Sequence, residues 1–255
     1  MQRSEDGRTV QAVQTTCEIV DLLRERGQAG VTELANELDL SKGTVHCQLA
    51  TLAQNEFVVK RDNDYQLSLR YLDFGEHIKE RLGIYDVVQE EVNDLAKATN
   101  ELAQFATEEY GRAVYVYKAS GQNAVQTASN VGMREYLHCI SLGKAMLAHF
   151  PESQVKEIVE YHGLPTFTDN TITDQDDLLD ELADTRERGY AIDRGEKIEG
   201  LRCIAAPVTE STGKILGAVS VSGPSRRMEG AWFDEELPQQ VRRSANVIEI
   251  NAQFS

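Results

Sequence analysis

LSKGTVHCQLATL, residues 40–52, determines the fold expected for the N-terminal part of the chain. Ser41 has a side chain suited to a helix N-cap. Val45, Leu49 and Leu52 recur at the spacing i, i+4, i+7, which places them on one buried face of a helix. A capped amphipathic helix that follows another helix after a short turn is typical of a helix-turn-helix.

Two further helices are expected before this one. Residues 10–26 have apolar residues at helical spacing and end before Gly27, and a second helix begins near Gly30 with Thr32 as its N-cap. The predicted buried faces are Val13, Cys17, Val20 and Leu22 or Leu23 in the first helix, and Leu34, Ala35 and Leu38 in the second.

Residues 57–69, FVVKRDNDYQLSL, contain two strand-like runs separated by Asp62-Asn63-Asp64. This pattern predicts a β-hairpin after the helices. We therefore expect a winged helix-turn-helix DNA-binding domain over residues 1–70.

With Val45 facing the core, the opposite face of the third helix is small in the middle and polar at its edges. Such a face allows the helix backbone to lie deep in the major groove. The basic side chains of this surface and of the hairpin are expected to bind phosphates, and the polar ones to contact bases or backbone. The residues predicted to contact DNA are Ser41, Lys42, Gly43, Thr44, His46, Cys47, Gln48, Lys60 and Arg61.

The chain has a formal net charge of −16, from 42 acidic and 26 basic residues, and DNA repels negative charge. Residues 1–75 hold 12 acids and 8 bases, a net of −4, so the other 180 residues carry −12. Residues 41–61 contain three bases and one acid, a local net charge of +2. We interpret the evenly spread surplus as the surface of a halophile protein, hydrated where salt shortens the Debye length to about 3 Å.

Composition restricts the class of protein further. A length of 255 residues with 41% hydrophobic residues suits two domains, and the sequence has neither a long apolar run nor a signal peptide. The four cysteines are far apart, which fits a reducing cytoplasm and argues against a disulfide framework. We expect a cytoplasmic protein with no membrane segment and no cofactor.

The remainder predicts a linker helix over residues 71–83, a helix over residues 87–98, and an effector-binding domain over residues 84–255. From residue 101 onward, strand-like runs such as LGAVSVSG mix with helical runs such as SLGKAMLAHF. Strands and helices in this order favour the α+β fold class with an antiparallel sheet.

GVTELANELDLSKGTVHCQLATL followed by YQLSLRYLDFG resembles the DNA-binding domain of the IclR family of transcriptional regulators. VGMREYLHCISLGKAMLA, TITD, RERGYAID, GLRCIAAPV and SVSGP resemble the effector-binding domain of the same family, in order. The chain departs from the family at Gly43, where Ser is usual, and at Cys47, where a large basic residue is usual. These departures imply altered operator specificity.

The resemblance implies a GAF- or PAS-like effector domain, and the residues suggest that its ligand is a small carboxylate. Ser141-Leu142-Gly143 open a helix whose backbone N–H groups suit an anion, and Ser220 and Ser222 share one face of a strand. Glu135 stands where an apolar residue is expected and favours a ligand with hydroxyl groups, such as a sugar acid. The implied pocket residues are Thr127, Glu135, Ser141, Leu142, Asp193, Leu201, Cys203, Ser220 and Ser222.

Other interpretations of these residues remain open. Cys203 with His138 suggests a thiol–imidazole pair of a cysteine-dependent enzyme, and the chain's His-Cys dipeptides with Cys203 suggest a metal- or redox-sensing GAF-like protein. Paired serines on a strand and a cysteine in an apolar run are also ordinary core residues. We favour a regulator that is not an enzyme and holds no metal.

The expected mechanism is ligand-controlled transcription. The resemblance implies a homodimer, or a tetramer formed by two dimers, on a pseudo-palindromic double-stranded operator. Two recognition helices about 34 Å apart would enter successive major grooves. A ligand that prefers one arrangement of the effector domains would change operator affinity.

Overall fold

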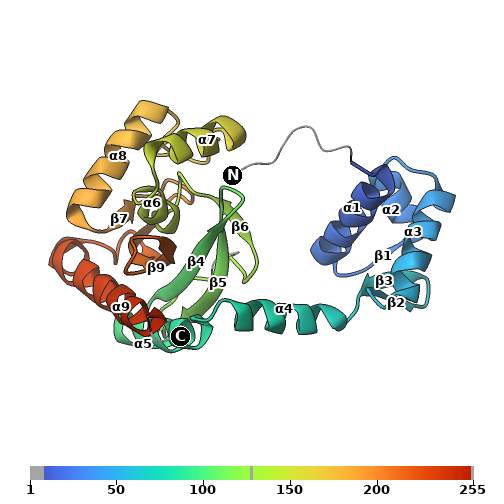
Figure 1. The fold of residues 1–255 in the computed structure, drawn as a ribbon, viewed down its shortest axis with the longest axis horizontal. Helices are drawn as coiled ribbons and strands as arrows, with labels where there is room; N and C mark the ends of the chain where they lie inside the picture. Colours follow the sequence, from blue (N-terminus) through green and yellow to red (C-terminus); the bar gives the residue numbers. More distant parts are fainter. Residues whose placement is uncertain (1–8, 127–128, 254–255) are drawn as a thin grey trace. The chain divides into compact units, whose positions relative to one another are not determined.

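The computed structural model describes residues 9–126 and 129–253, and it divides the chain into two compact units that meet between Leu82 and Gly83 (Figure 1). The N-terminal unit is a winged helix-turn-helix, and the C-terminal unit combines an antiparallel sheet with helices. The predicted α+β fold class is confirmed. No helix in the described ranges is long and apolar enough to cross a membrane.

The N-terminal unit packs three helices and a small sheet around one apolar core. This core includes Ile19, Leu34, Val45, Leu49 and Val58. The elements are α1 (Gln11–Arg26), β1 (Ala29–Gly30), α2 (Val31–Glu37), α3 (Lys42–Gln54), β2 (Val58–Arg61), β3 (Asp64–Leu67) and α4 (Arg70–Arg81).

Helix α3 begins as predicted and buries the predicted face. The Ser41 hydroxyl accepts a hydrogen bond from the backbone N–H of Thr44 at 3.0 Å. The N-cap predicted for α2 is wrong, because Gly30 occupies that position and Thr32 lies inside the first turn. Strand β1 pairs with β3 up to Gly30, so α2 begins directly after it.

The buried face predicted for α1 is confirmed at Leu23 and wrong at Val13 and Cys17. Thr15, Ile19 and Leu23 are buried, whereas Val13 and Cys17 are exposed. Apolar residues occur on two sides of this helix, so their spacing alone does not identify the side that packs on the core.

The wing is a three-stranded sheet in the order β1-β3-β2, one strand more than the predicted hairpin. The aromatic rings of Phe57 and Tyr71 are 5.9 Å apart, and the Arg70 guanidinium lies over the Phe57 ring. These contacts attach the start of α4 to the wing, although α4 itself has no buried residue.

The C-terminal unit is built on one antiparallel sheet in the order β6-β5-β4-β9-β8-β7. Its elements are α5 (Tyr85–Thr99), β4 (Leu102–Glu109), β5 (Arg112–Ser120), β6 (Arg134–Tyr136), α6 (Ser141–Leu147), α7 (Glu152–His162), α8 (Gln175–Arg188), β7 (Ala191–Asp193), β8 (Leu201–Thr209), β9 (Ile215–Pro224), the π-helical turn η1 (Trp232–Glu236) and α9 (Leu237–Ala252).

Helices cover both faces of this sheet (Figure 1). Helices α5 and α9 pack against each other on the face where Val219 and Val221 point, α5 mainly on β4 and β5 and α9 mainly on β8. Helix α6 packs on the other face, where Ala218 belongs to its apolar core. Ser220 and Ser222 therefore face the α6 side, because side chains alternate along a strand.

Helix α6 lies close against the backbone that precedes it. A Cβ atom added at Gly143 would lie 2.1 Å from the carbonyl oxygen of Leu137, whereas one added at Gly75 of α4 would meet nothing within 4 Å. The packing of α6 on the chain before it therefore requires glycine at residue 143.

Gly143→Ala should destabilise the C-terminal unit by roughly 1–3 kcal/mol, because the added methyl group forces the backbone at Leu137 to move. Urea denaturation measures this change. Gly75→Ala is the matched control and should stabilise its helix by up to about 1 kcal/mol. Equal stability of the Gly143→Ala variant and the natural chain would show that α6 has room to shift.

Candidate functional site

The outer face of α3 is exposed, as required of a helix that enters a groove of DNA. Of the residues predicted to contact DNA, those on α3 and its N-cap other than Gln48 are exposed: Ser41, Lys42, Gly43, Thr44, His46 and Cys47. His46 of α3 and Lys60 of the wing also line one open groove, so the structure brings these two predicted residues together.

Gln48 occupies a different environment from the others. It is half-buried, and its Oε1 accepts a hydrogen bond from the hydroxyl of Thr16 on α1. This contact attaches α3 to α1 and occupies the amide oxygen. Gln48 therefore helps to position the helix, and its role at DNA stays a prediction.

The wing carries less positive charge than the net charge of +2 for residues 41–61 suggests. Lys60 and Arg61 end strand β2 and are exposed, but Asp62 and Asp64 follow directly in the turn and in β3. Arg61 and Asp64 lie opposite each other in the sheet. These four residues carry no net charge, and Glu56 offsets Lys42, so the positive excess of residues 41–61 disappears once Asp62 and Asp64 are counted.

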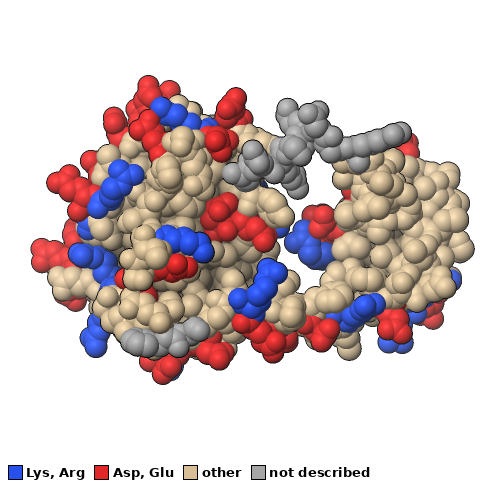
Figure 2. Space-filling model, in the orientation of Figure 1, with Lys and Arg blue, Asp and Glu red and all other residues tan. Residues whose placement is uncertain are grey.

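Figure 2 shows acidic and basic side chains scattered over the visible face of the C-terminal unit, with fewer charged atoms on that of the N-terminal unit. The acidic surplus therefore does not gather on the helix-turn-helix. This agrees with the charge of −4 that residues 1–75 contribute to the total of −16.

A cavity of about 260 Å³ lies in the C-terminal unit between the sheet and α6. This volume is small for a ligand site, since pockets for drug-sized molecules measure about 300–1,000 Å³. Its wall combines apolar and polar side chains. The lining residues are Gln104, Tyr115, Ser129, Met133, Glu135, Ile140, Ser141, Leu142, Asp193, Lys197, Ile198, Leu201, Cys203, Ser220 and Ser222.

The sheet register brings the polar lining residues together. Asp193 of β7 pairs with Cys203 of β8, and Cys203 pairs with Ser222 of β9. Ser220 pairs in the same way with Gln104 of β4. Directly paired residues point to the same face of a sheet, so these side chains form two adjacent rows on the cavity floor.

Two observations indicate that the cavity is suited to a polar ligand. Helix α6 begins at the cavity, with Ser141 and Leu142 in its wall. The Ser220 hydroxyl is buried and makes no hydrogen bond within the described part of the chain. A buried polar group without a partner is costly, and a ligand that bonds to Ser220 would remove that cost.

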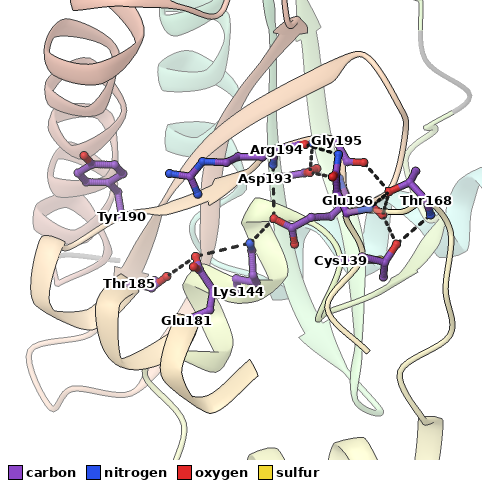
Figure 3. A network of polar contacts seen from close by, with 12 residues as sticks. Cys139, Lys144, Thr168, Glu181, Thr185, Tyr190, Asp193, Arg194, Gly195 and Glu196 are labelled. Atoms are coloured by element: carbon purple, nitrogen blue, oxygen red, sulfur yellow. Dashed lines mark hydrogen bonds and ion pairs between the residues drawn. The ribbon is translucent and has the colours of Figure 1, made fainter. Parts of the chain in front are cut away.

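Asp193 lies at the end of β7 and is buried. Its Oδ1 accepts hydrogen bonds from the backbone N–H groups of Gly195 and Glu196, at 2.9 and 2.7 Å (Figure 3). Burial and the nearby carboxylate of Glu196 raise the pKa of Asp193 to about 7, although these hydrogen bonds and Lys144 act in the opposite direction. Its protonation therefore changes near neutral pH.

The alternative of a cysteine nucleophile is not supported by the surroundings of Cys203. Burial and the neighbouring Asp193 raise the pKa of this thiol well above its ordinary value, so it stays protonated and is a weak nucleophile. His138 is not among the described residues of the cavity wall, and its Nε2 lies 3.1 Å from the carbonyl oxygen of Pro165. No group of three potential metal ligands occurs among the described residues.

The structure brings the predicted effector residues into one cavity wall, apart from Thr127, which lies outside the described residues. Glu135 differs from expectation, because its carboxylate forms an ion pair with Lys197 at 2.7 Å. Sequence reasoning missed Lys197 and Gln104. Gln104 alternates with apolar residues along β4, whereas Lys197 lies in a loop without periodic signal.

Asp193→Asn should remove one component of the pH dependence of stability. Between pH 3.8 and about 7 the folded chain keeps the Asp193 proton and the unfolded chain releases it, so this group lowers the free energy of unfolding as pH rises. The variant should therefore gain stability relative to the natural chain by on the order of 1 kcal/mol per pH unit in that window.

Urea denaturation at several pH values between about 5 and 8 measures this difference. Asp184→Asn, at an exposed carboxylate of α8, is the control and should leave the slope unchanged. The comparison cancels the titration of other buried groups such as His138, whose pKa is lowered by burial. Parallel curves for the natural chain and Asp193→Asn would contradict the prediction.

Both units of the chain match domains of known proteins. Residues 12–62 match the IclR helix-turn-helix domain, and residues 76–250 match the C-terminal domain of bacterial IclR transcriptional regulators. A probable HTH-type transcriptional regulator, ArcR of Halobacterium salinarum, is 35% identical over 95% of this chain and 94% of its own. The HTH-type transcriptional regulator XynR of Escherichia coli is 28% identical over 90% of this chain and 94% of its own.

Solved structures share the fold of this chain over nearly its whole length. The crystal structure of Thermotoga maritima IclR has a TM-score of 0.79 and 27% identity, and the match covers 95% of this chain and 98% of that one. An IclR homolog from Microbacterium hydrocarbonoxydans, complexed with 4-hydroxybenzoate, shares the fold with a TM-score of 0.82 and 22% identity over 96% of this chain and 98% of that one. With its two units matched in order, the chain belongs to the IclR family of transcriptional regulators.

Proposed function

We propose that this regulator binds a specific double-stranded operator and that a small carboxylate ligand in the C-terminal cavity controls its affinity for that operator. The observation that carries the proposal is the pairing of two features in one chain. These are the exposed, capped recognition helix and a cavity with a buried serine hydroxyl that has no partner among the described residues. The named relatives are also transcriptional regulators. We place the protein in the cytoplasm, where its DNA lies.

In the proposed DNA complex, α3 enters the major groove and the wing lies along the backbone. Lys42, Lys60 and Arg61 contact phosphates, and Thr44 and His46 contact bases or backbone. Gly43 and Cys47 keep the centre of the helix surface small. Because each recognition element has few cations, its binding should release few counterions.

The salt dependence of DNA binding tests this mode of contact. Fluorescence anisotropy with a promoter fragment selected by sequencing DNA bound in cells should show a shallow decrease of affinity with rising KCl. Replacing Lys42 by Ala should reduce the slope of log K against log salt by about 1 per protomer, and so by about 2 for a bound dimer, because each copy leaves one phosphate without its cation.

Lys97→Ala removes an exposed lysine from α5 of the other unit and is the matched control. Its slope should equal that of the natural chain. If promoter fragments were not bound, or if replacing Lys42, Lys60 and Arg61 together left affinity and slope unchanged, the proposed DNA interface would be refuted.

The proposed effector is a small acid that carries hydroxyl groups, such as a sugar acid. The cavity volume suits a small molecule, and the two serines, Gln104 and Asp193 supply hydrogen-bonding groups along its floor. The IclR homolog from Microbacterium hydrocarbonoxydans, which shares the fold, was crystallised in complex with a small carboxylate, 4-hydroxybenzoate. A ligand that binds one arrangement of the effector domains more tightly shifts the population toward it and so changes operator affinity.

We further propose that the chain works as a homodimer, or as a tetramer of two dimers, on a pseudo-palindromic operator. Helix α4 has no buried residue in the described chain, and it exposes Leu72 and Ile78. Helix α1 exposes Val13 and Cys17. Burial, and then the nearby Cys17, raise the pKa of Tyr71 on α4, so Cys17 lies close to that helix. We propose that the exposed apolar side chains of α1 and α4 pack against the same side chains of a second copy of the chain.

Leu72→Asp and Val13→Asp should therefore weaken self-association, with a dissociation constant raised by about tenfold or more. Sedimentation at several protein concentrations distinguishes monomer, dimer and tetramer. Val131→Asp replaces an exposed apolar residue of the C-terminal unit and is the control. Unchanged association of the first two variants would place the interface elsewhere.

A further inference from the structure

The charges in the cavity wall present a problem for an acidic ligand. Asp193 and Glu135 are both carboxylates, and Lys197 is the one cation among the described lining residues. With Asp193 ionised these three side chains carry a net charge of −1, and with Asp193 protonated their net charge is zero. Among the described lining residues, Lys197 is therefore the cation with which an entering carboxylate can form an ion pair.

Two contacts within the chain hold the ammonium group of Lys197. Its Nζ lies 2.7 Å from Oε2 of Glu135 and 3.5 Å from the centroid of the Phe167 ring. The side chains of Lys197 and Glu135 are 22% and 11% exposed, so both charges are largely removed from water. An ammonium group between a carboxylate and an aromatic face retains a strong preference for an anion.

We infer that the ligand carboxylate binds Lys197 in place of Glu135, so that Glu135 is an internal substitute for the ligand. The exchange keeps the ammonium paired, because the ligand carboxylate takes the place beside Nζ from which the Glu135 carboxylate moves away. The displaced Glu135 stays in the cavity wall as a hydrogen-bond acceptor for hydroxyl groups. The site thus selects acids that also carry hydroxyls. This inference rests on the proposed effector role of the cavity.

The alternative is that Glu135 and Lys197 only tie β6 to the loop after β7. The two roles predict opposite effects of losing Glu135 on the affinity for acids. A structural tie predicts that loss of either partner weakens the binding of every ligand, charged or uncharged. Exchange predicts that loss of Glu135 strengthens the binding of acids, that loss of Lys197 weakens it, and that neutral analogues respond to neither.

Calorimetric titration of the full-length protein tests the exchange with three acid–amide pairs: gluconate and gluconamide, 4-hydroxybenzoate and 4-hydroxybenzamide, and acetate and acetamide. For the acids that bind, Lys197→Gln should weaken binding by about tenfold or more, and Glu135→Gln should tighten it by a similar factor. The affinities of the amides should stay unchanged. Thermal unfolding checks that each variant is folded.

Glu152→Gln and Lys156→Gln are matched controls, because this pair is also an ion pair at 2.6 Å but lies on the exposed surface of α7. They should change no affinity. If acids bound the Lys197→Gln variant as tightly as the natural chain, or if Glu135→Gln weakened them, the exchange would be refuted while the effector role of the cavity stood. If no acid bound the natural chain or Glu135→Gln, both proposals would fail.

Discussion

The buried ammonium of Lys144 fixes the wall of the cavity in the C-terminal unit. Lys144 of α6 is fully buried, and its Nζ lies 2.6 Å from Oε1 of Glu196 and 3.6 Å from Oε1 of Glu181 on α8 (Figure 3). Breaking such a buried pair by removing one partner costs about 3–5 kcal/mol, because the other charge is left without compensation. The pair therefore holds α6, α8 and the loop after β7 in one arrangement.

Threonine hydroxyls fix the backbone of the same loop. Thr168 donates to the carbonyl oxygen of Gly195 at 2.7 Å, and Thr171 donates to that of Glu196 at 2.6 Å. Asp193 precedes this segment, and Lys197 follows it directly. The backbone between these two ionisable residues of the cavity wall is thus held by contacts outside the cavity.

Local sequence patterns predicted the parts of the fold that depend on local interactions. The Ser41 cap and the Val45 stripe of α3 follow from helix geometry alone, and both are present. The buried side of α1 cannot be predicted from helix geometry, because apolar residues lie on two faces of this helix and tertiary packing selects one of them. The partnership of Glu135 with Lys197 joins residues 62 positions apart, and it depends on where a non-periodic loop returns to the sheet.

The cavity chemistry also depends on how β8 aligns with its neighbours. Cys203 faces the ligand side because it is paired with Asp193 and Ser222, and the register of β8 with β9 shifts only near Val208. A slip of one residue along β8 would reverse its two faces. Arg202 and Ile204 would then replace the thiol, so the pocket would gain a cation and an apolar branch without any change in amino-acid sequence. Strand alignment is therefore as much a determinant of the chemistry of the cavity as the identity of the side chains.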